Sequence, residues 1–527
     1  MKIKGLIATI FMSLALCACP KAKDNSQAEQ PSDGIIDLYC INDYHGRVSQ
    51  VQQGYHYEGG IARFATYLKN RMNENPDGSV FLNAGDLWQD TYDSAMNKGE
   101  LLTKAMGELN CEAMALGNHE FDWGLDQIKQ NKAVADPYGF TFLGANIYNY
   151  NNGPTTQASD LASPYKIIER KGIKIGLIGG IGVNQITSIT STNWENITFV
   201  DPVPVVKQLS DKLRSEDGCQ LIVYLYHGGL ENANYLQLSQ ISPVTDEPYV
   251  NAGFLGHDHA FESIKCSDDV AWVQSYQHGA VLGHIQLKVN KTTEVTYFSD
   301  FAHDDSNYSI RKENGYGYGP QSIYESAEDP SIKALVDSYL TDEFKSERDN
   351  NICTLSNISP GSTISNEFGG VANYIVNEHI NSLRSEHSEI PTIDIVINNG
   401  TRDSITVNSV CKLSYEDIFN LIPFTNKVII AKVKGSDIRR ECVTYSNPYY
   451  CPNGAFTINN NSYYNIACID YLLLHKNADR QYNYFTSYTS SIYTIDNYPY
   501  ELVYSYFKKG NAFDMSFLSN SKFTDLN

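Results

Sequence analysis

The chain has 527 residues, of which 42% are hydrophobic and 19% are charged, so its composition is that of a globular protein rather than of a disordered or fibrous one. Its length allows at least two domains, each able to bury a substantial core. The 40 basic and 61 acidic residues give a formal net charge of -21. A surface with this charge repels nucleic-acid polymers, so we do not expect long polyanions as partners. A local pocket that binds a small anion is still compatible with the charge.

The N-terminus, MKIKGLIATIFMSLALCACPK, combines two lysines with an apolar run from Gly5 to about Ala18. That run is too short to span a bilayer and has the charge and length of an export signal. Its end, LCAC, is similar to the bacterial lipoprotein signal and places Cys19 at the lipid-bearing position, whereas an ordinary cleaved signal is the alternative. We therefore predict a signal over residues 1–19, a flexible tether over 20–33, and a lipid on Cys19 that holds the protein on the outer side of a bacterial membrane, in the cell envelope.

From Gly34 to about Ser299, short apolar runs end in Gly, Asn, Asp or His. These runs are GIIDLYCIND, SVFLNAGD, EAMALGN, IKIGLIGG, QLIVYLYHGG and YVNAGFLGHDH. Apolar runs of about five to eight residues indicate buried strands, and the intervening segments IARFATYLKNRM and ELLTKAMGELN have helical spacing. The alternation predicts a layered α/β domain over residues 34–325, with functional groups on the loops beyond the strand ends.

Residues 329–350, DPSIKALVDSYLTDEFKSERDN, have the pattern of a charged amphipathic helix, which predicts a linker helix over residues 326–352. A second globular unit is expected over residues 353–527. Of 11 cysteines, nine lie beyond the signal, and they contain no CxxC pair that would indicate a zinc finger or a redox motif. Export permits disulfides, and Cys442 with Cys451 is a plausible short loop, although spacing alone does not determine the pairing.

Polar side chains follow the apolar runs of the first unit. They are Asp43 and His45 in NDYHG, Asp86 in NAGD, Asn118, His119, Glu120 and Asp122 in ALGNHEFDWG, His227 in YLYHGG, and His257 and His259 in GHDHA. Any one of them has an ordinary explanation as a turn, a cap or a solvated imidazole, but five such sites in one structural setting indicate a shared function.

Imidazole, carboxylate and amide groups together suit Zn, Mn, Co or Fe(II). Seven of these residues are candidate ligands, which is too many for one tetrahedral zinc. Two metals that share a bridging carboxylate would use them all, and that arrangement recurs in phosphoester hydrolysis.

The order DxH, GD, GNHE, H and GHxH resembles the calcineurin-like metallophosphoesterase superfamily, and the forms NDYHG, NAGDLWQ, ALGNHEFDWG and GHDH are similar to its two-domain 5'-nucleotidase family. The resemblance implies an N-terminal four-layer β-sandwich flanked by helices and a C-terminal α/β domain that binds the substrate. It also implies one metal held by Asp43, His45 and His259, a second held by Asn118, His227 and His257, and Asp86 as the bridge between them.

The same resemblance implies a catalytic dyad of His119 and Asp122. His119 is suited to stabilise a phosphoryl oxygen or to assist the leaving oxygen, and Asp122 is suited to orient the imidazole. Glu120 is expected to be an outer residue of the site or a charge at a helix N-terminus.

Similarity to the family continues in NNGTRDSI (398–405), IFNLIPFTNKVIIAKVKGSDI (418–438) and YNIACIDYLLLH (464–475). It implies that Arg402 lies near the anionic part of a nucleotide and that Phe424 and Tyr471 sandwich the base. Core packing is the alternative for the two aromatics, and a surface position is the alternative for Arg402. The NNGTR loop is one residue shorter than the family pattern, and HKNADRQYNYF replaces a glycine-rich run.

We therefore predict a metal-dependent phosphoric monoester hydrolase that uses two divalent ions and a metal-bound water to release phosphate from nucleoside 5'-monophosphates or related nucleotides. Cyclic nucleotides, nucleotide sugars and other small phosphoesters are alternative substrates. A non-catalytic binding lipoprotein is the alternative outside the enzymes.

Overall fold

The computed structural model describes residues 34–53, 56–266, 270–289, 291–299, 323–359, 361–402, 404–407, 411–477, 480–488 and 492–523. The predicted signal, the tether and Cys19 lie outside the described residues. Within the described residues no helix is both long enough and apolar enough to cross a membrane.

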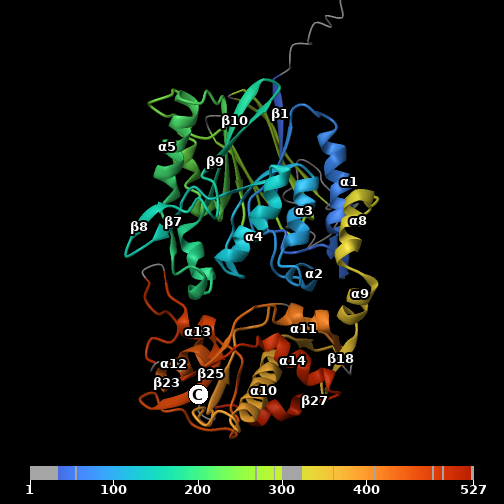
Figure 1. Ribbon diagram of the computed structural model, residues 1–527, viewed down its shortest axis with the longest axis vertical. Coiled ribbons are helices and arrows are strands. Elements are labelled where there is room, and N and C mark those ends of the chain that lie inside the picture. Colours follow the sequence, from blue (N-terminus) through green and yellow to red (C-terminus); the bar gives the residue numbers. More distant parts are fainter. Residues whose placement is uncertain are drawn as a thin grey trace, which may run out of the picture. The chain divides into compact units, whose positions relative to one another are not determined.

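Two six-stranded sheets form the first part of the chain (Figure 1). One has the order β17-β16-β1-β4-β5-β6, with β1 (Ile35–Ile41), β4 (Ser79–Asn83), β5 (Cys111–Ala115), β6 (Thr141–Leu143), β16 (Val281–Lys288) and β17 (Lys291–Ser299). The other has the order β14-β15-β13-β12-β10-β9, with β9 (Tyr165–Arg170), β10 (Ile173–Ile181), β12 (Leu221–His227), β13 (Ala252–Leu255), β14 (Phe261–Lys265) and β15 (Ala271–Ser275). All six apolar runs form strands, as predicted.

The sheets pack face to face because alternate residues of each strand point to opposite faces. Ile36 and Leu38 of β1 share one buried cluster with Leu221 and Val223 of β12, between the sheets. Tyr39 of β1 belongs instead to a cluster that includes residues of α1 (Gly60–Met72), α3 (Glu100–Glu108) and α4 (Leu125–Ala135). Residues of β12 on the far side pack with α5 (Pro202–Ser215). The predicted four layers, two sheets between two layers of helices, are therefore confirmed (Figure 1).

Shorter elements complete this part. They are β2 (Val51–Gln53), β3 (His56–Glu58), α2 (Tyr92–Ala95), β7 (Ile147–Tyr150), β8 (Pro154–Gln157), β11 (Ile197–Phe199), α6 (Tyr235–Leu238), and the 3-10 helices η1 (His119–Phe121), η2 (Asp136–Tyr138), η3 (Val183–Ser188), η4 (Ser191–Asn193) and η5 (Leu230–Asn232).

The expected single helix over residues 329–350 is wrong: the structure has two helices, α8 (Pro330–Tyr339) and α9 (Asp342–Arg348). Leu340 leaves the helical conformation, with φ -91° and ψ 67°, and is buried with Ile332 and Val336. The side chain of Thr341 then accepts a hydrogen bond from the Phe344 backbone N–H and starts a new helix. The break arises because burial of Leu340 and a cap at Thr341 outweigh a continuous helical pattern.

The last part of the chain is an α/β unit around a five-stranded sheet of order β24-β20-β25-β23-β26. Its strands are β20 (Ile395–Ile397), β23 (Val428–Lys434), β24 (Tyr449–Tyr450), β25 (Tyr463–Ile469) and β26 (Tyr493–Ile495), and a second sheet holds β18 (Asn351–Ser356), β22 (Cys411–Ser414) and β27 (Phe513–Asp514). The other elements are β19 (Thr363–Ile364), β21 (Ile405–Thr406), α10 (Asn366–Leu383), α11 (Tyr415–Leu421), α12 (Gly435–Arg439), a π-helix η6 (Arg440–Thr444), α13 (Asp470–Leu474), α14 (Pro499–Lys508) and η7 (Met515–Asn520). The exact domain boundaries stay a prediction.

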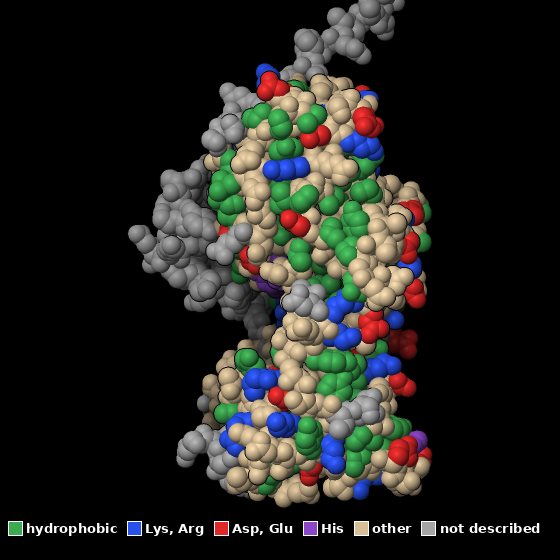
Figure 2. Space-filling view, turned by 90° about the vertical axis from the view of Figure 1, so that its left-hand side faces the viewer, with side chains coloured by type: hydrophobic (Ala, Val, Ile, Leu, Met, Phe, Trp, Pro, Cys, Tyr) green, Lys and Arg blue, Asp and Glu red, His purple; other side chains and the backbone are tan. Residues whose placement is uncertain are grey.

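The cysteines of the described residues are all free thiols, including Cys442 and Cys451, which are both buried. The short disulfide loop considered from spacing is therefore not formed in this structure. On the face drawn in Figure 2, Lys and Arg side chains are scattered among Asp, Glu and uncharged groups.

Candidate metal centre and catalytic site

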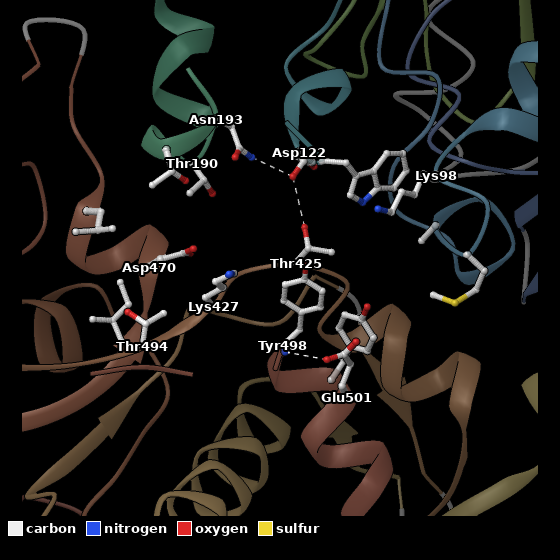
Figure 3. Close-up of a pocket in the computed structure, with 17 residues that line it drawn as sticks. Lys98, Asp122, Thr190, Asn193, Thr425, Lys427, Asp470, Thr494, Tyr498 and Glu501 are labelled. Atoms are coloured by element: carbon white, nitrogen blue, oxygen red, sulfur yellow. Dashed lines mark hydrogen bonds between the residues drawn. The ribbon is translucent and has the colours of Figure 1, made fainter. Parts of the chain in front are cut away.

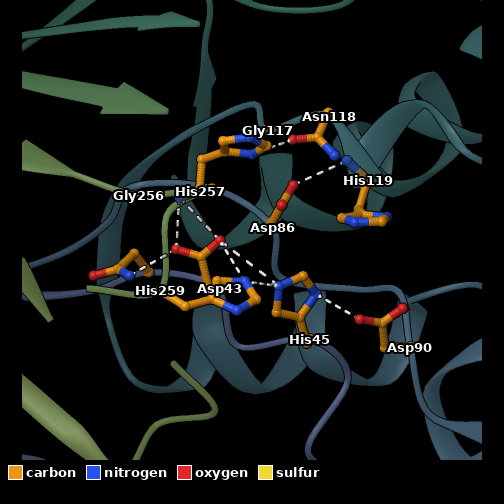
Figure 4. A network of polar contacts seen from close by, with 12 residues as sticks. Asp43, His45, Asp86, Asp90, Gly117, Asn118, His119, Gly256, His257 and His259 are labelled. Atoms are coloured by element: carbon orange, nitrogen blue, oxygen red, sulfur yellow. Dashed lines mark hydrogen bonds and ion pairs between the residues drawn. The ribbon is translucent and has the colours of Figure 1, made fainter. Parts of the chain in front are cut away.

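The predicted ligands lie on loops that leave the carboxyl ends of parallel strands. Asp43 and His45 follow β1, Asp86 follows β4 and Asn118 follows β5, while His227 ends β12 and His257 and His259 follow β13. Because β1, β4 and β5 run parallel, as do β12 and β13, their carboxyl ends meet at one edge of each sheet. The structure brings all seven residues together there, as Figure 4 shows for most of them.

The backbone turns sharply at five of these positions. The φ angles are 49° at Asp43, 50° at His45, 55° at Asp86, 78° at His257 and 51° at His259. Non-glycine residues rarely adopt this left-handed conformation, which costs roughly 1 to 3 kcal/mol each and concentrates at functional sites. Bonds between the loops hold it: Asp43 donates its N–H to the Gly85 carbonyl at 2.9 Å, and His45 donates to the Asp86 carbonyl at 3.0 Å.

Asp43, His45 and His259 form one group of converging donor atoms. The Nε2 atoms of His45 and His259 lie 2.8 Å apart. Oδ1 of Asp43 is 3.4 Å from Nε2 of His259 and 3.7 Å from Nε2 of His45. Two imidazole nitrogens and a carboxylate oxygen that face one point make a suitable cation site.

Asp86, Asn118, His227 and His257 form the second group. Nε2 of His227 lies 3.1 Å from Oδ2 of Asp86 and 3.1 Å from Oδ1 of Asn118, and Nδ1 of His257 lies 2.9 Å from the same amide oxygen. Nδ1 of His227 is 2.9 Å from the Ala84 carbonyl, so in the neutral imidazole the proton lies on that nitrogen and Nε2 is the atom that can bind a cation.

The charge of the two central carboxylates suits cations. Burial acts to raise the pKa of Asp43, but the contacts with His259 and His45 hold that pKa below its usual range. Burial likewise opposes ionisation of Asp86, but the positive charges of His227 and His119 lower its pKa. Both carboxylates are therefore ionised in the folded protein at neutral pH.

His119 and Asp122 lie at the rim of the two groups. Nδ1 of His119 is 2.7 Å from Oδ2 of Asp122, and the His119 ring centre is 5.2 Å from that of His45. Burial acts to lower the pKa of His119, but the charges of Asp122 and Asp86 raise it to about 10. The pair has the geometry of an imidazole whose tautomer is set by a carboxylate.

Glu120 is fully buried behind this site. Its Oε2 accepts hydrogen bonds from the backbone N–H groups of Asp86, at 2.9 Å, and Gly117, at 2.7 Å. Its Oε1 accepts from the N–H of Leu87, at 2.8 Å. Its carboxylate joins the loop after β4 to the loop after β5, which is the outer position expected for Glu120, and the residue also lies in the first turn of η1, which is the other expectation.

Two further residues contact the site without having been predicted. Asp90 places Oδ2 3.2 Å from Nδ1 of His45, and the N–H of His278 donates to the Asp43 carbonyl at 2.8 Å. Asp90 lies four residues after Asp86, but no periodicity or motif distinguished it from a turn residue.

The residues assigned to substrate binding lie in different settings. The Arg402 side chain is 37% exposed and pairs with Asp90 at 2.6 Å, which brings it to the edge of the metal centre. Phe424 is half-buried in the loop between α11 and β23. Tyr471 is also half-buried, its ring centre is 4.6 Å from that of His475, and its hydroxyl donates to the Thr187 carbonyl at 3.3 Å.

A cavity of about 580 Å³ lies beside the dyad (Figure 3). Asp122, Asn193, Thr425, Lys427 and Asp470 are among its lining residues. Asn193 and Thr425 donate hydrogen bonds to the Asp122 carbonyl, at 3.0 Å and 3.4 Å. Its volume is in the range of small-molecule sites, and it adjoins the chain neighbours of Phe424 and Tyr471.

Residues 36–261 match the calcineurin-like phosphoesterase family. An apyrase of Tabanus yao is 23% identical over 456 residues, covering 82% of this chain and 77% of the apyrase. A 5'-nucleotidase of Vibrio cholerae is 25% identical over 465 residues, which cover 82% of this chain and 79% of the Vibrio cholerae protein. The crystal structure of a 5'-nucleotidase precursor from Thermus thermophilus shares the fold, with a TM-score of 0.66 at 17% identity over 91% of this chain and 97% of that one.

The match of residues 36–261 and the converging ligands indicate a calcineurin-like phosphoesterase domain, so the protein is a metal-dependent hydrolase of phosphoesters. Proteins of this class use two divalent metal ions, and the two groups of side chains provide a place for each, so the prediction of two divalent cofactors is confirmed. The motifs that resemble the two-domain 5'-nucleotidase family are accompanied by a likeness of 25% identity to the Vibrio cholerae 5'-nucleotidase and by the fold shared with the Thermus thermophilus structure.

Proposed function

We propose that this protein releases phosphate from nucleoside 5'-monophosphates or related nucleotides. The observation that carries the proposal is the placement of the His119–Asp122 pair beside two groups of metal-ligating side chains, in a chain similar over most of its length to proteins named 5'-nucleotidase and apyrase. The cavity next to Asp122 supports a small organic substrate.

We assign one metal to Asp43, His45 and His259 and the other to Asn118, His227 and His257, with Asp86 between them. When bound, the two ions supply an activated water and neutralise charge on the phosphoryl oxygens. His119 donates a hydrogen bond to a phosphoryl or leaving oxygen, and Asp122 holds the imidazole so that Nε2 carries the donated proton.

Arg402 is assigned to the anionic part of the substrate. Its Nε and Nη2 are used by Asp90, and its Nη1 carries two further N–H donors. Phe424 and Tyr471 are assigned to the base, with which stacking is worth about 1 to 3 kcal/mol in single-stranded nucleic-acid binders.

We also propose that the chain is exported and anchored by lipid on Cys19, on the evidence of its N-terminal sequence. Mass spectrometry of the mature N-terminus tests the anchor: a diacylated or triacylated Cys19 supports it, and an unmodified terminus at another residue contradicts it.

Phosphate release from AMP, UMP, ribose 5-phosphate, cyclic AMP and a nucleotide sugar, each with and without EDTA, tests the function. We expect EDTA to abolish activity and kcat/KM to be highest for AMP and UMP. Phe424→Ala and Tyr471→Ala should each lower kcat/KM for AMP by roughly 5- to 150-fold and leave ribose 5-phosphate little changed. Phe517→Ala, at a ring that is 49% exposed, is the matched control. Preference for ribose 5-phosphate, or equal losses on every substrate, would contradict the nucleotide assignment.

A further inference from the structure

Asp90 is a buried carboxylate in an unusual backbone conformation next to the metal centre (Figure 4). Its side chain is 8% exposed, and its φ is 116°, a region that L-residues rarely adopt. A side chain retained at such a position has to be held by its surroundings, and backbone strain of this kind clusters at functional sites. The contacts of the carboxylate indicate what this side chain does.

The first contact is with His45. Nε2 of this ring faces His259 and Asp43, where the first metal is assigned. Nδ1 on the opposite edge lies 3.2 Å from Oδ2 of Asp90, at the distance of an ion pair but without the angles of a hydrogen bond. A metal-ligating histidine commonly presents its second nitrogen to a carboxylate or a carbonyl, which sets the tautomer and the ring orientation. His227 has the Ala84 carbonyl in that place. Asp90 occupies the corresponding place for His45, with a negative charge.

The second contact is with Arg402, which is 312 residues further along the chain. Nη2 of Arg402 donates to Oδ2 of Asp90 at 2.6 Å, and Nε donates to the same oxygen at 3.1 Å. The oxygen that faces His45 therefore also receives both hydrogen bonds from the guanidinium.

His45, Asp90 and His119 could also be taken for a third cation site, because their ligand atoms lie within 4.8 Å of one another. The guanidinium of Arg402 already supplies a positive charge at Oδ2 of Asp90, so a further cation at this oxygen would meet a like charge. The contacts therefore indicate that the Asp90 carboxylate positions His45 and Arg402 and does not bind a third metal.

We propose that Asp90 is a positioning residue that holds His45 and Arg402 together and thereby couples the affinity of the first metal site to the substrate-binding arginine. This inference rests on the proposed function for the roles of His45 and Arg402. Arg402 reaches His45 through Asp90, because Asp90 Oδ2 is the atom that both side chains contact. The loop that carries Arg402 therefore influences metal binding even before substrate is present.

The coupling is tested by isothermal titration calorimetry, in which Mn²⁺ alone is added to the metal-free protein. Asp90→Asn keeps the shape but removes the charge, and we expect it to weaken one of the two Mn²⁺ equivalents by about 10- to 100-fold and leave the other unchanged. Asp90→Gly should weaken the same equivalent while the melting temperature stays at or above that of the wild type, because glycine accepts a φ of 116°. Excess Mn²⁺ should restore much of the kcat of Asp90→Asn.

Asp93→Asn is the matched control. The Asp93 side chain is also buried, at 3% exposure, and accepts two hydrogen bonds from Nη1 of Arg348, at 2.8 Å and 3.0 Å, but Arg348 is not a metal ligand. We expect Asp93→Asn to lower the melting temperature and to leave both Mn²⁺ affinities within about 2-fold of the wild type, since breaking a buried ion pair of this kind acts on stability.

Arg402→Gln completes the test as a double-mutant cycle with Asp90→Asn. Alone, Arg402→Gln should weaken the same Mn²⁺ equivalent by at least about 3-fold, and the double variant should bind Mn²⁺ as Asp90→Asn does. Unchanged Mn²⁺ affinity in Asp90→Asn, or losses that simply multiply in the double variant, would overturn the coupling. If the wild type binds fewer than two Mn²⁺, the proposed function itself fails, and the two failures are thereby distinguished.

Discussion

His475 should make the folded protein sensitive to mild acid. The side chain is 1% exposed and packs against the tilted rings of Tyr471 and Tyr484, with ring centres 4.6 Å and 4.9 Å away. Among the described residues, neither ring nitrogen has a hydrogen-bond partner. Burial therefore lowers the pKa of His475 from 6.5 to about 4, because a charged imidazole would lose its hydration without gaining a partner.

The sign and the size of the effect follow from proton linkage. The unfolded chain takes up a proton at His475 near pH 6.5, whereas the folded chain does so only near pH 4. The contribution to stability is thus complete above the unfolded pKa and is lost as the pH falls between these two values. A difference of one pKa unit is worth about 1.4 kcal/mol, so the free energy of unfolding should fall by about 2 kcal/mol between about pH 7 and pH 5 through this residue.

Urea unfolding of the wild type and of His475→Phe over this pH range provides the assay. Phenylalanine keeps an aromatic ring but cannot titrate, so His475→Phe should lose about 2 kcal/mol less than the wild type between pH 7 and pH 5. It should also be at least as stable at pH 7, since it removes a buried polar group without partners. His387→Gln, at a histidine that is 38% exposed, is the control and should follow the wild type. Parallel pH profiles for His475→Phe and the wild type would refute the reasoning.

Three further predictions concern the catalytic site. His119→Ala should lower kcat by roughly 10²- to 10⁴-fold with no change in bound metal, as measured by single-substrate kinetics and elemental analysis, and a loss of metal would contradict its assignment. Gly117→Ala should weaken metal binding by about 10-fold or more in a Mn²⁺ titration, because a Cβ there would lie 2.2 Å from Oδ1 of Asp86; unchanged affinity would show that the loop adjusts. Glu120→Gln should lower the free energy of unfolding by about 1 to 3 kcal/mol, because a carboxamide cannot accept all three backbone hydrogen bonds that the carboxylate accepts now. Urea unfolding at neutral pH measures that loss, and wild-type stability would mean that the three donors find other acceptors.

Local sequence patterns were enough to predict the strands and the chemistry of the ligands. Apolar runs in β1, β4, β5, β10, β12 and β13 specify buried strands through the period of their side chains, and the polar residues that end five of these runs supply the chemical types of a metal centre. Parallel strands deliver such loop residues to one edge of a sheet, so the meeting of His45 with Asp86, which follow the neighbouring strands β1 and β4, was predictable once the strands were recognised.

Contacts between residues that are distant in the chain depend on the folded protein as a whole. Sequence periodicity does not predict that Asp90 pairs with Arg402 or that Leu340 is buried and ends α8. It also does not predict that Glu120 accepts hydrogen bonds from backbone N–H groups of two loops. The left-handed backbone at the metal ligands could not be read from residue type either, because hydrogen bonds between neighbouring loops impose it. These features arise from the way in which two sheets and a distant loop pack, and packing is a property of the complete tertiary structure rather than of any short segment.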